Sequence, residues 1–214
     1  MGAPQPHDLI WLSDPEAFAA QAALPDWVGA AWLARAPVVV RRDRAPDGRI
    51  PIGLRGMLRS QRHAAWLPAA QCAKIVTPMD IATQARWHLH PRRAEIPALR
   101  TLARLAPRLD ALSCQWGVTG AVGFALACGI DVLHADSDVD LLLVSAQPLP
   151  QAELQALSAL LEAGEEARLD IQVATPYGAF ALRERLRTGG RVLLKTDTGP
   201  VLCADPWQSP WACC

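Results

Sequence analysis

The sequence has 214 residues, of which 51% are hydrophobic and 20% are charged, as is typical of a globular protein of one large domain or two small ones. Its 21 basic and 21 acidic residues give a net charge of zero, which argues against a nucleic-acid-binding protein that relies on neutralising phosphates. The longest apolar stretch, over 27–40, contains Arg35 and Pro37 and is too short to span a bilayer, so we expect no membrane insertion.

The N-terminal residues and the cysteines predict a cytoplasmic protein. Residues 1–8 contain neither the charged nor the apolar region of a secretory signal. The six cysteines show no C-x-x-C spacing, so we expect reduced thiols and no zinc site. They are Cys72, Cys114, Cys128, Cys203, Cys213 and Cys214.

Residues 1–92 predict a small α+β domain. Ser13-Asp14-Pro15-Glu16 is a capping box that begins a helix over 15–23. Asp47-Gly48 is a turn signal between two strands, which therefore form a hairpin. The other elements expected here are a helix over 26–36, strands over 38–42 and 50–54, and a helix over 77–88.

The charged, proline-containing segment 90–97 has no apolar periodicity and predicts a domain boundary between residues 92 and 93. Strands and helices alternate beyond it, which predicts a mixed sheet flanked by helices over 93–214, and hence an α/β (α+β) protein of two domains. The expected helices cover 98–112 (kinked or ended by Pro107), 122–128, 150–163 (ending at Gly164) and 179–187. The expected strands cover 115–118, 137–144, 169–173 and 191–195.

The segment 137–144 carries two acidic residues at alternate positions. In a strand, Asp138 and Asp140 lie on one face and Val139 and Leu141 on the other. Two adjacent carboxylates are unfavourable unless a cation lies between them, and Mg²⁺ held by carboxylates usually also binds substrate phosphates. The alternative is that one aspartate caps a turn while the other is a solvated edge residue.

Two further features support phosphate chemistry. Asp170 lies in a strand whose apolar residues take the other face, so pairing with the first strand would place three carboxylates together, enough to hold Mg²⁺. The turn over 118–123 contains Gly120 and Gly123, which allow backbone amides at a helix start to approach a phosphate.

These features in this order resemble the nucleotidyltransferase fold. More narrowly, the chain resembles the malonate decarboxylase holo-acyl-carrier-protein synthases, also called phosphoribosyl-dephospho-CoA transferases. The stretches that carry the resemblance are His7–Leu12, Pro51–Gly56, Gly117–Gly120, Ser137–Leu142, Leu193–Thr196 with Gly199-Pro200, and Asp205–Trp207.

The resemblance implies a reaction and its partners. The donor is 2′-(5″-triphosphoribosyl)-3′-dephospho-CoA, and its phosphoribosyl-dephospho-CoA group is transferred to a serine of the apo acyl-carrier subunit of malonate decarboxylase, with release of pyrophosphate. Asp138 and Asp140 match the catalytic acids. Mg²⁺ is the expected cofactor, with Asp138, Asp140 and Asp170 as its ligands.

The phosphate turn departs from the wider fold, because Ala121 replaces a serine after Gly120. Substrate binding is therefore assigned to Gly120, Ala121 and Gly123, with Lys195 and Arg183 as cationic candidates. Five other arginines either form a basic face for the acidic carrier protein or the CoA pyrophosphate or are ordinary surface, and ordinary surface is expected for most of them: Arg41, Arg42, Arg55, Arg59 and Arg62. The alternatives are another Mg²⁺-dependent nucleotidyltransferase that adenylylates a protein or small molecule, and a non-catalytic carrier-binding chaperone on a degenerate fold.

Overall fold

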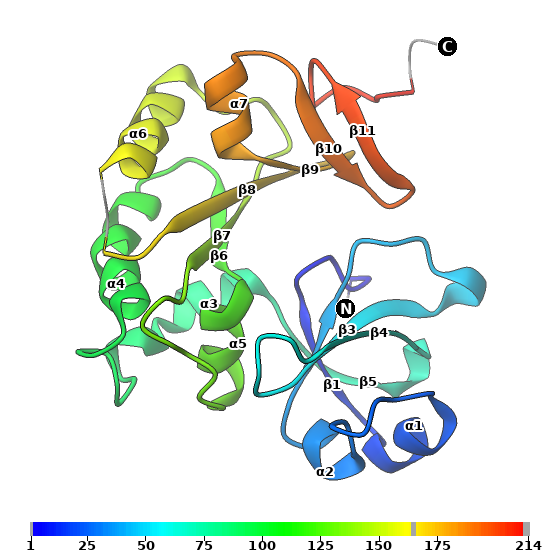
Figure 1. The fold of residues 1–214 in the computed structure, drawn as a ribbon. Coiled ribbons are helices and arrows are strands. Elements are labelled where there is room, and N and C mark those ends of the chain that lie inside the picture. The colour runs from blue at the N-terminus through cyan, green and yellow to red at the C-terminus, as the bar shows by residue number, and fades with distance from the viewer. Residues whose placement is uncertain (1, 164–165, 212–214) are drawn as a thin grey trace.

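The computed structural model of the protein describes residues 2–163 and 166–211 and contains two β-sheets (Figure 1). The first sheet has the strand order β4-β3-β2-β1-β5 and the second has the order β11-β10-β9-β8-β7-β6. The strands of the first sheet are β1 Leu9–Leu12, β2 Val38–Val40, β3 Ile50–Arg55, β4 Arg62–Leu67 and β5 Cys72–Val76. Those of the second are β6 Gln115–Val118, β7 Val139–Val144, β8 Leu169–Thr175, β9 Gly178–Ala181, β10 Val192–Thr196 and β11 Gly199–Cys203.

The first sheet is antiparallel throughout, and the predicted pairing of its β2 and β3 strands is confirmed. Residues alternate along β3, so that Ile50, Ile52 and Leu54 are buried on the face that packs with Phe18. The helices beside this sheet are α1 (Pro15–Gln21), capped by Asp14 as predicted, and α2 (Ala30–Leu33). The helix expected over 26–36 is thus only one turn, because Gly29 is its N-cap in extended conformation.

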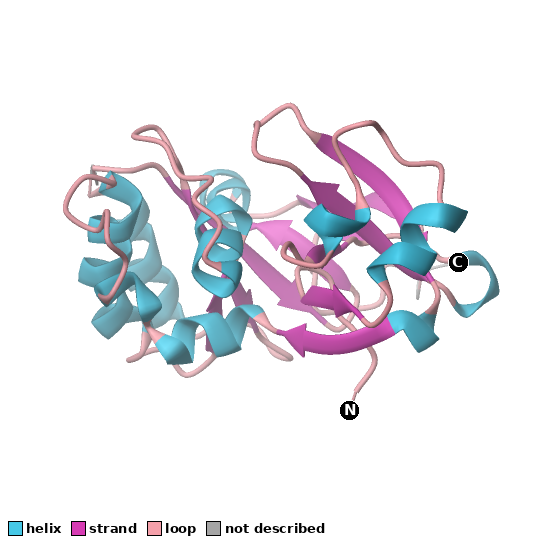
Figure 2. Ribbon diagram, turned by 90° about the horizontal axis from the view of Figure 1, so that it is seen from below, coloured by secondary structure: helices cyan, strands magenta, loops and turns pink. Residues whose placement is uncertain are grey.

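The second sheet is mixed. Its β7 and β8 strands are parallel and are separated in sequence by helix α6 (Gln151–Glu162), whereas the remaining neighbours are antiparallel. Figure 1 shows α4 (Pro97–Leu109), α6 and α7 (Leu182–Thr188) on the side of this sheet that faces away from the first sheet. Figure 2 shows the helices mainly on the two outer flanks, with the strands between them. The predicted α/β architecture is confirmed.

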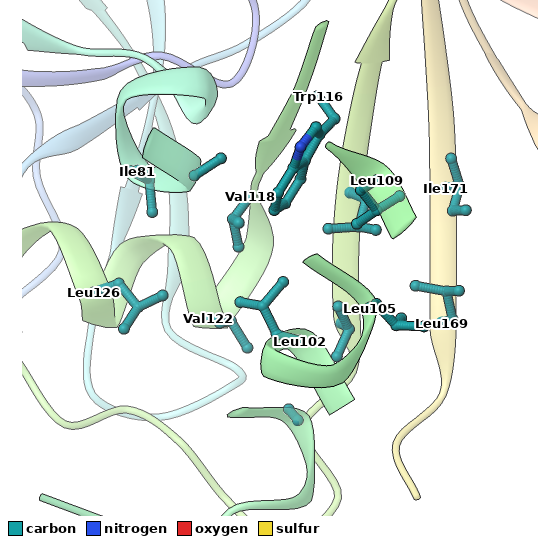
Figure 3. Close-up of a cluster of buried hydrophobic side chains, with 14 of the residues drawn as sticks. Ile81, Leu102, Leu105, Leu109, Trp116, Val118, Val122, Leu126, Leu169 and Ile171 are labelled. Atoms are coloured by element: carbon teal, nitrogen blue, oxygen red, sulfur yellow. The ribbon is translucent and has the colours of Figure 1, made fainter. Parts of the chain in front are cut away.

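Buried leucines of α4 form the core beneath the second sheet. Leu102, Leu105 and Leu109 lie one or two helical turns apart and point toward Val118 of β6 and Ile171 of β8 (Figure 3). Of the two effects predicted for Pro107, ending the helix is wrong, since the helix continues to Leu109, and a kink stays a prediction. Proline lacks the N–H that would donate to the carbonyl four residues earlier, and Pro107 lies in the last turn, two residues before the helix ends.

Helix α3 (Pro78–Gln84) packs against the second sheet, although it follows the last strand of the first. A Cβ atom added to Gly117 of β6 would lie 2.4 Å from the backbone carbon of Pro78, so only glycine permits this approach. The boundary between residues 92 and 93 stays a prediction, but α3, placed by the sequence in the first domain, contacts the second sheet. Helix α5 (Gly120–Cys128) also contacts α3.

The predicted helix over 179–187 begins only at Leu182, because residues 178–181 form β9. A Cβ on Gly178 would lie 2.5 Å from the Lys195 carbonyl oxygen, so this glycine brings β9 close to β10. The predicted helix end at Gly164 lies outside the described residues, as do Cys213 and Cys214. Short 3₁₀ segments cover Pro46–Gly48, Ala69–Gln71 and Arg86–His88. Within the described ranges, every helix is too short or too polar to cross a membrane.

Candidate active site

The acidic strand lies beside the strand that carries Asp170, as predicted. Asp140 of β7 is in direct register with Asp170 of β8 in the parallel pair. Asp138 precedes β7 and follows a turn closed by two hydrogen bonds, in which the His134 amide donates to Ser137 Oγ at 2.9 Å and the Ser137 amide donates to the His134 carbonyl at 3.1 Å. The turn and the sheet together fix the backbone on either side of the acidic pair.

The surroundings of Asp140 disfavour its charge. Burial raises the pKa of this carboxyl above its usual value of 3.8, and the neighbouring charges of Asp170 and Asp138 raise it further. A cation placed among these three carboxylates would reverse that effect, because it stabilises the ionised form.

Gly120 allows Asp140 to lie directly over the start of α5. Its φ is +64°, and an added Cβ would lie 1.8 Å from Asp140 Oδ2. The Thr119 amide donates to the Asp140 carbonyl at 2.9 Å, and the Thr119 side chain makes no capping bond. The first amides of α5 are therefore left without a side-chain cap. Gly123 permits close helix–strand packing, since a Cβ there would lie 2.6 Å from the Val118 carbonyl oxygen.

A small cavity joins the acidic pair to the other domain. It has a volume of about 160 Å³ and is bounded by Asp138 and Asp140, by Gly120 and Ala121 of α5, and by arginines of the first sheet and its β3–β4 turn. These arginines are Arg55, Arg59 and Arg62, for which ordinary surface was the favoured expectation and a basic face the alternative. We name this space the acidic cavity. Ala121 does line it, so the hydroxyl that the wider fold supplies is absent here.

Arg55 and Arg62 are paired directly opposite each other on β3 and β4, an arrangement of like charges that destabilises a sheet. Within the described residues, neither makes an ion pair with a carboxylate. Burial, together with Arg62 and Arg59, lowers the pKa of Arg55 to about 10, and burial followed by Arg59 lowers the pKa of Arg62. The Arg55 guanidinium lies 5.4 Å from the ring centre of Phe124. This unneutralised pair is suited to bind an anion.

The two cationic candidates from the sequence lie elsewhere. Lys195 is on β10, three strands from β7 in the sheet, and it is exposed. Arg183 donates to the main-chain carbonyls of Leu161 and Leu169 at 3.5 and 3.4 Å. The structure therefore does not bring Lys195 or Arg183 to Asp138 and Asp140. Positive charge at the acidic cavity comes from the first domain instead, which no local sequence pattern around the acids indicates.

Asp138 and Asp140 suit Mg²⁺ binding, but the predicted site of three carboxylates is not preformed. Across the part of the chain that the structure describes, no three His, Cys, Asp or Glu side chains form a ready-made metal site. Mg²⁺, however, is usually held by one or two carboxylates together with substrate phosphates. Asp138 and Asp140 provide such carboxylates at the acidic cavity, and the raised pKa of Asp140 indicates that negative charge is in excess there.

A larger cavity adjoins the acidic cavity between the two domains. Its volume is about 420 Å³, and Arg55, Arg62 and Gly120 line both spaces. His7, which has a φ of 78°, lies on its wall. Burial, followed by the charges of Arg42 and Lys195, lowers the pKa of His7 from 6.5 to about 4. His7 is therefore neutral at pH 7.

The lowered pKa of His7 predicts acid sensitivity. Between pH 6.5 and about 4 the unfolded chain binds a proton at His7 that the folded protein does not, so the free energy of unfolding falls as the pH falls, by up to about 1.4 kcal/mol per pH unit. The His7→Asn variant has no imidazole to bind this proton in the unfolded chain, and asparagine tolerates the positive φ at this position. Urea unfolding from pH 7 to pH 4.5 should show a shallower slope for the variant, and equal slopes would contradict the assignment.

Family models of phosphoribosyl-dephospho-CoA transferase MdcG match almost the whole chain. The model of the N-terminal domain matches residues 5–78 and that of the C-terminal domain matches residues 79–206. The chain is 47% identical to the phosphoribosyl-dephospho-CoA transferase of Klebsiella pneumoniae strain 342, over 96% of this chain and 97% of the relative. It is 45% identical to that of Azotobacter vinelandii, covering 96% and 95% of the two chains. No solved structure gives a significant match.

Proposed function

Since the chain belongs to the phosphoribosyl-dephospho-CoA transferase family, we propose that it transfers the prosthetic group from 2′-(5″-triphosphoribosyl)-3′-dephospho-CoA to a serine of the apo acyl-carrier subunit of malonate decarboxylase. The observation that carries this proposal is the acidic cavity, where Asp138 and Asp140 lie with Arg55 and Arg62, two arginines that have no carboxylate partner among the described residues, and with Arg59, which pairs with Asp136 at 3.7 Å. A triphosphate with its counter-cation complements both groups of charges.

The reaction is an in-line displacement at the α-phosphorus. The serine oxygen of the carrier forms the new phosphorus–oxygen bond, the bond to the β-phosphate breaks, and pyrophosphate leaves. A carboxylate of the pair Asp138 and Asp140 suits the role of proton acceptor for the serine hydroxyl, because both line the cavity in which the phosphates would lie. Mg²⁺, held by Asp138 and Asp140 with Asp170 beside them, would neutralise charge on the phosphates when bound.

The rest of the cavity orients the triphosphate. The uncapped amides at the start of α5, at Gly120 and Ala121, can donate to phosphate oxygens, and the helix dipole favours negative charge there. Arg55 and Arg62 approach from the first domain and can bind the leaving pyrophosphate. The two domains thus supply complementary parts of one site.

The direct test is to weigh the carrier. The protein is incubated with apo acyl-carrier subunit, the triphosphoribosyl donor and Mg²⁺, and the carrier is analysed by mass spectrometry. The expected result is a mass increase by one phosphoribosyl-dephospho-CoA group at a single serine, with release of pyrophosphate. An unmodified carrier after prolonged incubation would refute the proposal, and transfer of label from ATP instead would identify an adenylylating enzyme.

Arg62→Gln should weaken donor binding without destabilising the protein. A charge-assisted hydrogen bond contributes about 1.5–3 kcal/mol, so KM for the donor should rise about 10- to 100-fold. The melting temperature should stay the same or rise, because the substitution removes a like charge opposite Arg55. Arg187→Gln, at an exposed position of α7, is the matched control and should change neither quantity. A melting temperature that falls together with activity would indicate a structural role for Arg62.

A further inference from the structure

The cavity of about 420 Å³ between the domains, which we name the interdomain cavity, is not used by the phosphate chemistry. Its size lies within the range of about 300–1,000 Å³ that is common for small-molecule sites. It opens onto the acidic cavity, because Arg55, Arg62 and Gly120 belong to both walls. A molecule whose phosphates occupy the acidic cavity can therefore extend into this space without leaving the protein.

One wall of the interdomain cavity, its floor, is a row of paired residues of the first sheet. Val39, Gly53 and Ala64 are paired across β2, β3 and β4 and form one row, and all three line the cavity. Gly53 has no side chain and Ala64 has only a methyl group, and the aliphatic part of the Arg41 side chain lies beside Gly53, 3.4 Å from the position that an added Cβ would take. Gly123 and Phe124 of α5 line the same space. A flat ring system fits such a floor better than a branched or globular group.

Polar and charged side chains contribute to the lining of this space, which includes His7, Arg41, Arg55, Arg62, His63 and Thr119. The Arg55 guanidinium is placed near the face of Phe124, which leaves a planar cation available for stacking. His7 is on the wall, and in the described structure its imidazole makes no hydrogen bond. A neutral imidazole can donate one hydrogen bond and accept another. The remaining lining is largely aliphatic, with Leu9, Leu54 and Ile81 among its residues.

We propose that the interdomain cavity binds the adenine base of the dephospho-CoA part of the donor. This inference rests on the proposed function, since it assigns a place to a part of that substrate. A purine has two broad apolar faces and a polar edge, which match the floor and the unpartnered His7. The pantetheine arm carries two amides, whose burial along an aliphatic wall without partners would be unfavourable.

A side chain that fills the interdomain cavity should weaken the binding of 3′-dephospho-CoA. Ala64 is exposed on β4, so Ala64→Leu places a larger side chain over Gly53 without overpacking the core. The dissociation constant of 3′-dephospho-CoA should rise by about tenfold or more. Ala73→Leu is the matched control, because Ala73 is exposed on β5 of the same sheet and does not line the cavity. Isothermal titration calorimetry measures both constants, and circular dichroism checks that both variants are folded.

A photoreactive probe locates the base itself. An 8-azidoadenine analogue of dephospho-CoA should label peptides from β3, β4 or the first turn of α5, and AMP should suppress the labelling more effectively than 4′-phosphopantetheine. Labelling confined to other segments, suppression by 4′-phosphopantetheine alone, or equal binding of dephospho-CoA by the Ala64→Leu and unmodified proteins would overturn the inference. Carrier modification by the unmodified protein would stand in each case, so the two proposals fail separately.

Discussion

Asp140→Asn is expected to lower the rate of carrier modification by about 10²–10⁴-fold, the range for loss of a positioned proton acceptor, while the protein stays folded. Asp140 lines the acidic cavity and lies over the start of α5, and asparagine keeps its shape without its charge. The carrier mass assay measures the rate, and Asp26→Asn, at an exposed position outside the site, serves as the control. Unchanged activity in the Asp140 variant would favour a non-catalytic carrier-binding protein.

The same variant should be more stable than the unmodified protein at neutral pH. The pKa of Asp140 is raised in the folded state, so its favourable contribution is complete only below the unfolded value of 3.8 and is lost as the pH rises through the folded pKa. At pH 7 the folded protein contains a carboxylate whose charge is disfavoured by burial and by Asp170 and Asp138. Melting temperatures should therefore diverge as the pH increases from 4 to 7, and a lower melting temperature for the variant at pH 7 would contradict this account.

Gly120→Ala is expected to reduce both stability and activity. Gly120 adopts the left-handed conformation with a φ of +64°. For a residue with a side chain this conformation costs about 1–2 kcal/mol. The added methyl group would also lie 1.8 Å from Asp140 Oδ2, so Asp140 must move and the acidic cavity must change shape. Urea unfolding and the carrier assay measure the two effects.

Gly129→Ala is the control that carries the cost of the left-handed backbone without the steric contact with Asp140. Gly129 has a φ of +72° but nothing lies within 4 Å of its added Cβ, so this control should lose stability only by the backbone term and should retain activity. A double-mutant cycle with Asp140→Gly isolates the contact, since Gly120→Ala should be less destabilising when Asp140 has no side chain. Equal effects of the two glycine substitutions, on both stability and activity, would show that the contact with Asp140 is unimportant.

The acidic strand could be recognised locally because a strand alternates its faces. The spacing of Asp138 and Asp140 predicts a shared face, and the apolar residues around Asp170 predict a second strand with its carboxylate on one side. The structure confirms that Asp140 and Asp170 are neighbours in register. The glycines at 120 and 123 were likewise recognisable, although the pattern predicts a phosphate turn and does not reveal that Gly120 makes room for Asp140.

The arginines of the site could not be assigned to it from the local sequence pattern in the same way. Arg55 and Arg62 precede the acids by more than 70 residues, and their spacing alone is that of ordinary surface arginines. They become significant only because β3 and β4 pair them opposite each other and the first sheet faces the second. Lys195 and Arg183 follow the acids more closely in the chain, yet the sheet order and the helical layer place them elsewhere.

The α/β architecture and the acidic strand were recognisable from residue order and short-range periodicity, and the family was recognisable from the motifs that the chain shares with it. Three features became visible only in the folded protein: which cations face those acids, why residue 120 is glycine, and that an interdomain cavity adjoins the site. The physical reason is that side-chain orientation repeats over a few residues and is visible locally, whereas charge complementarity and close packing depend on segments that folding brings together from distant parts of the chain.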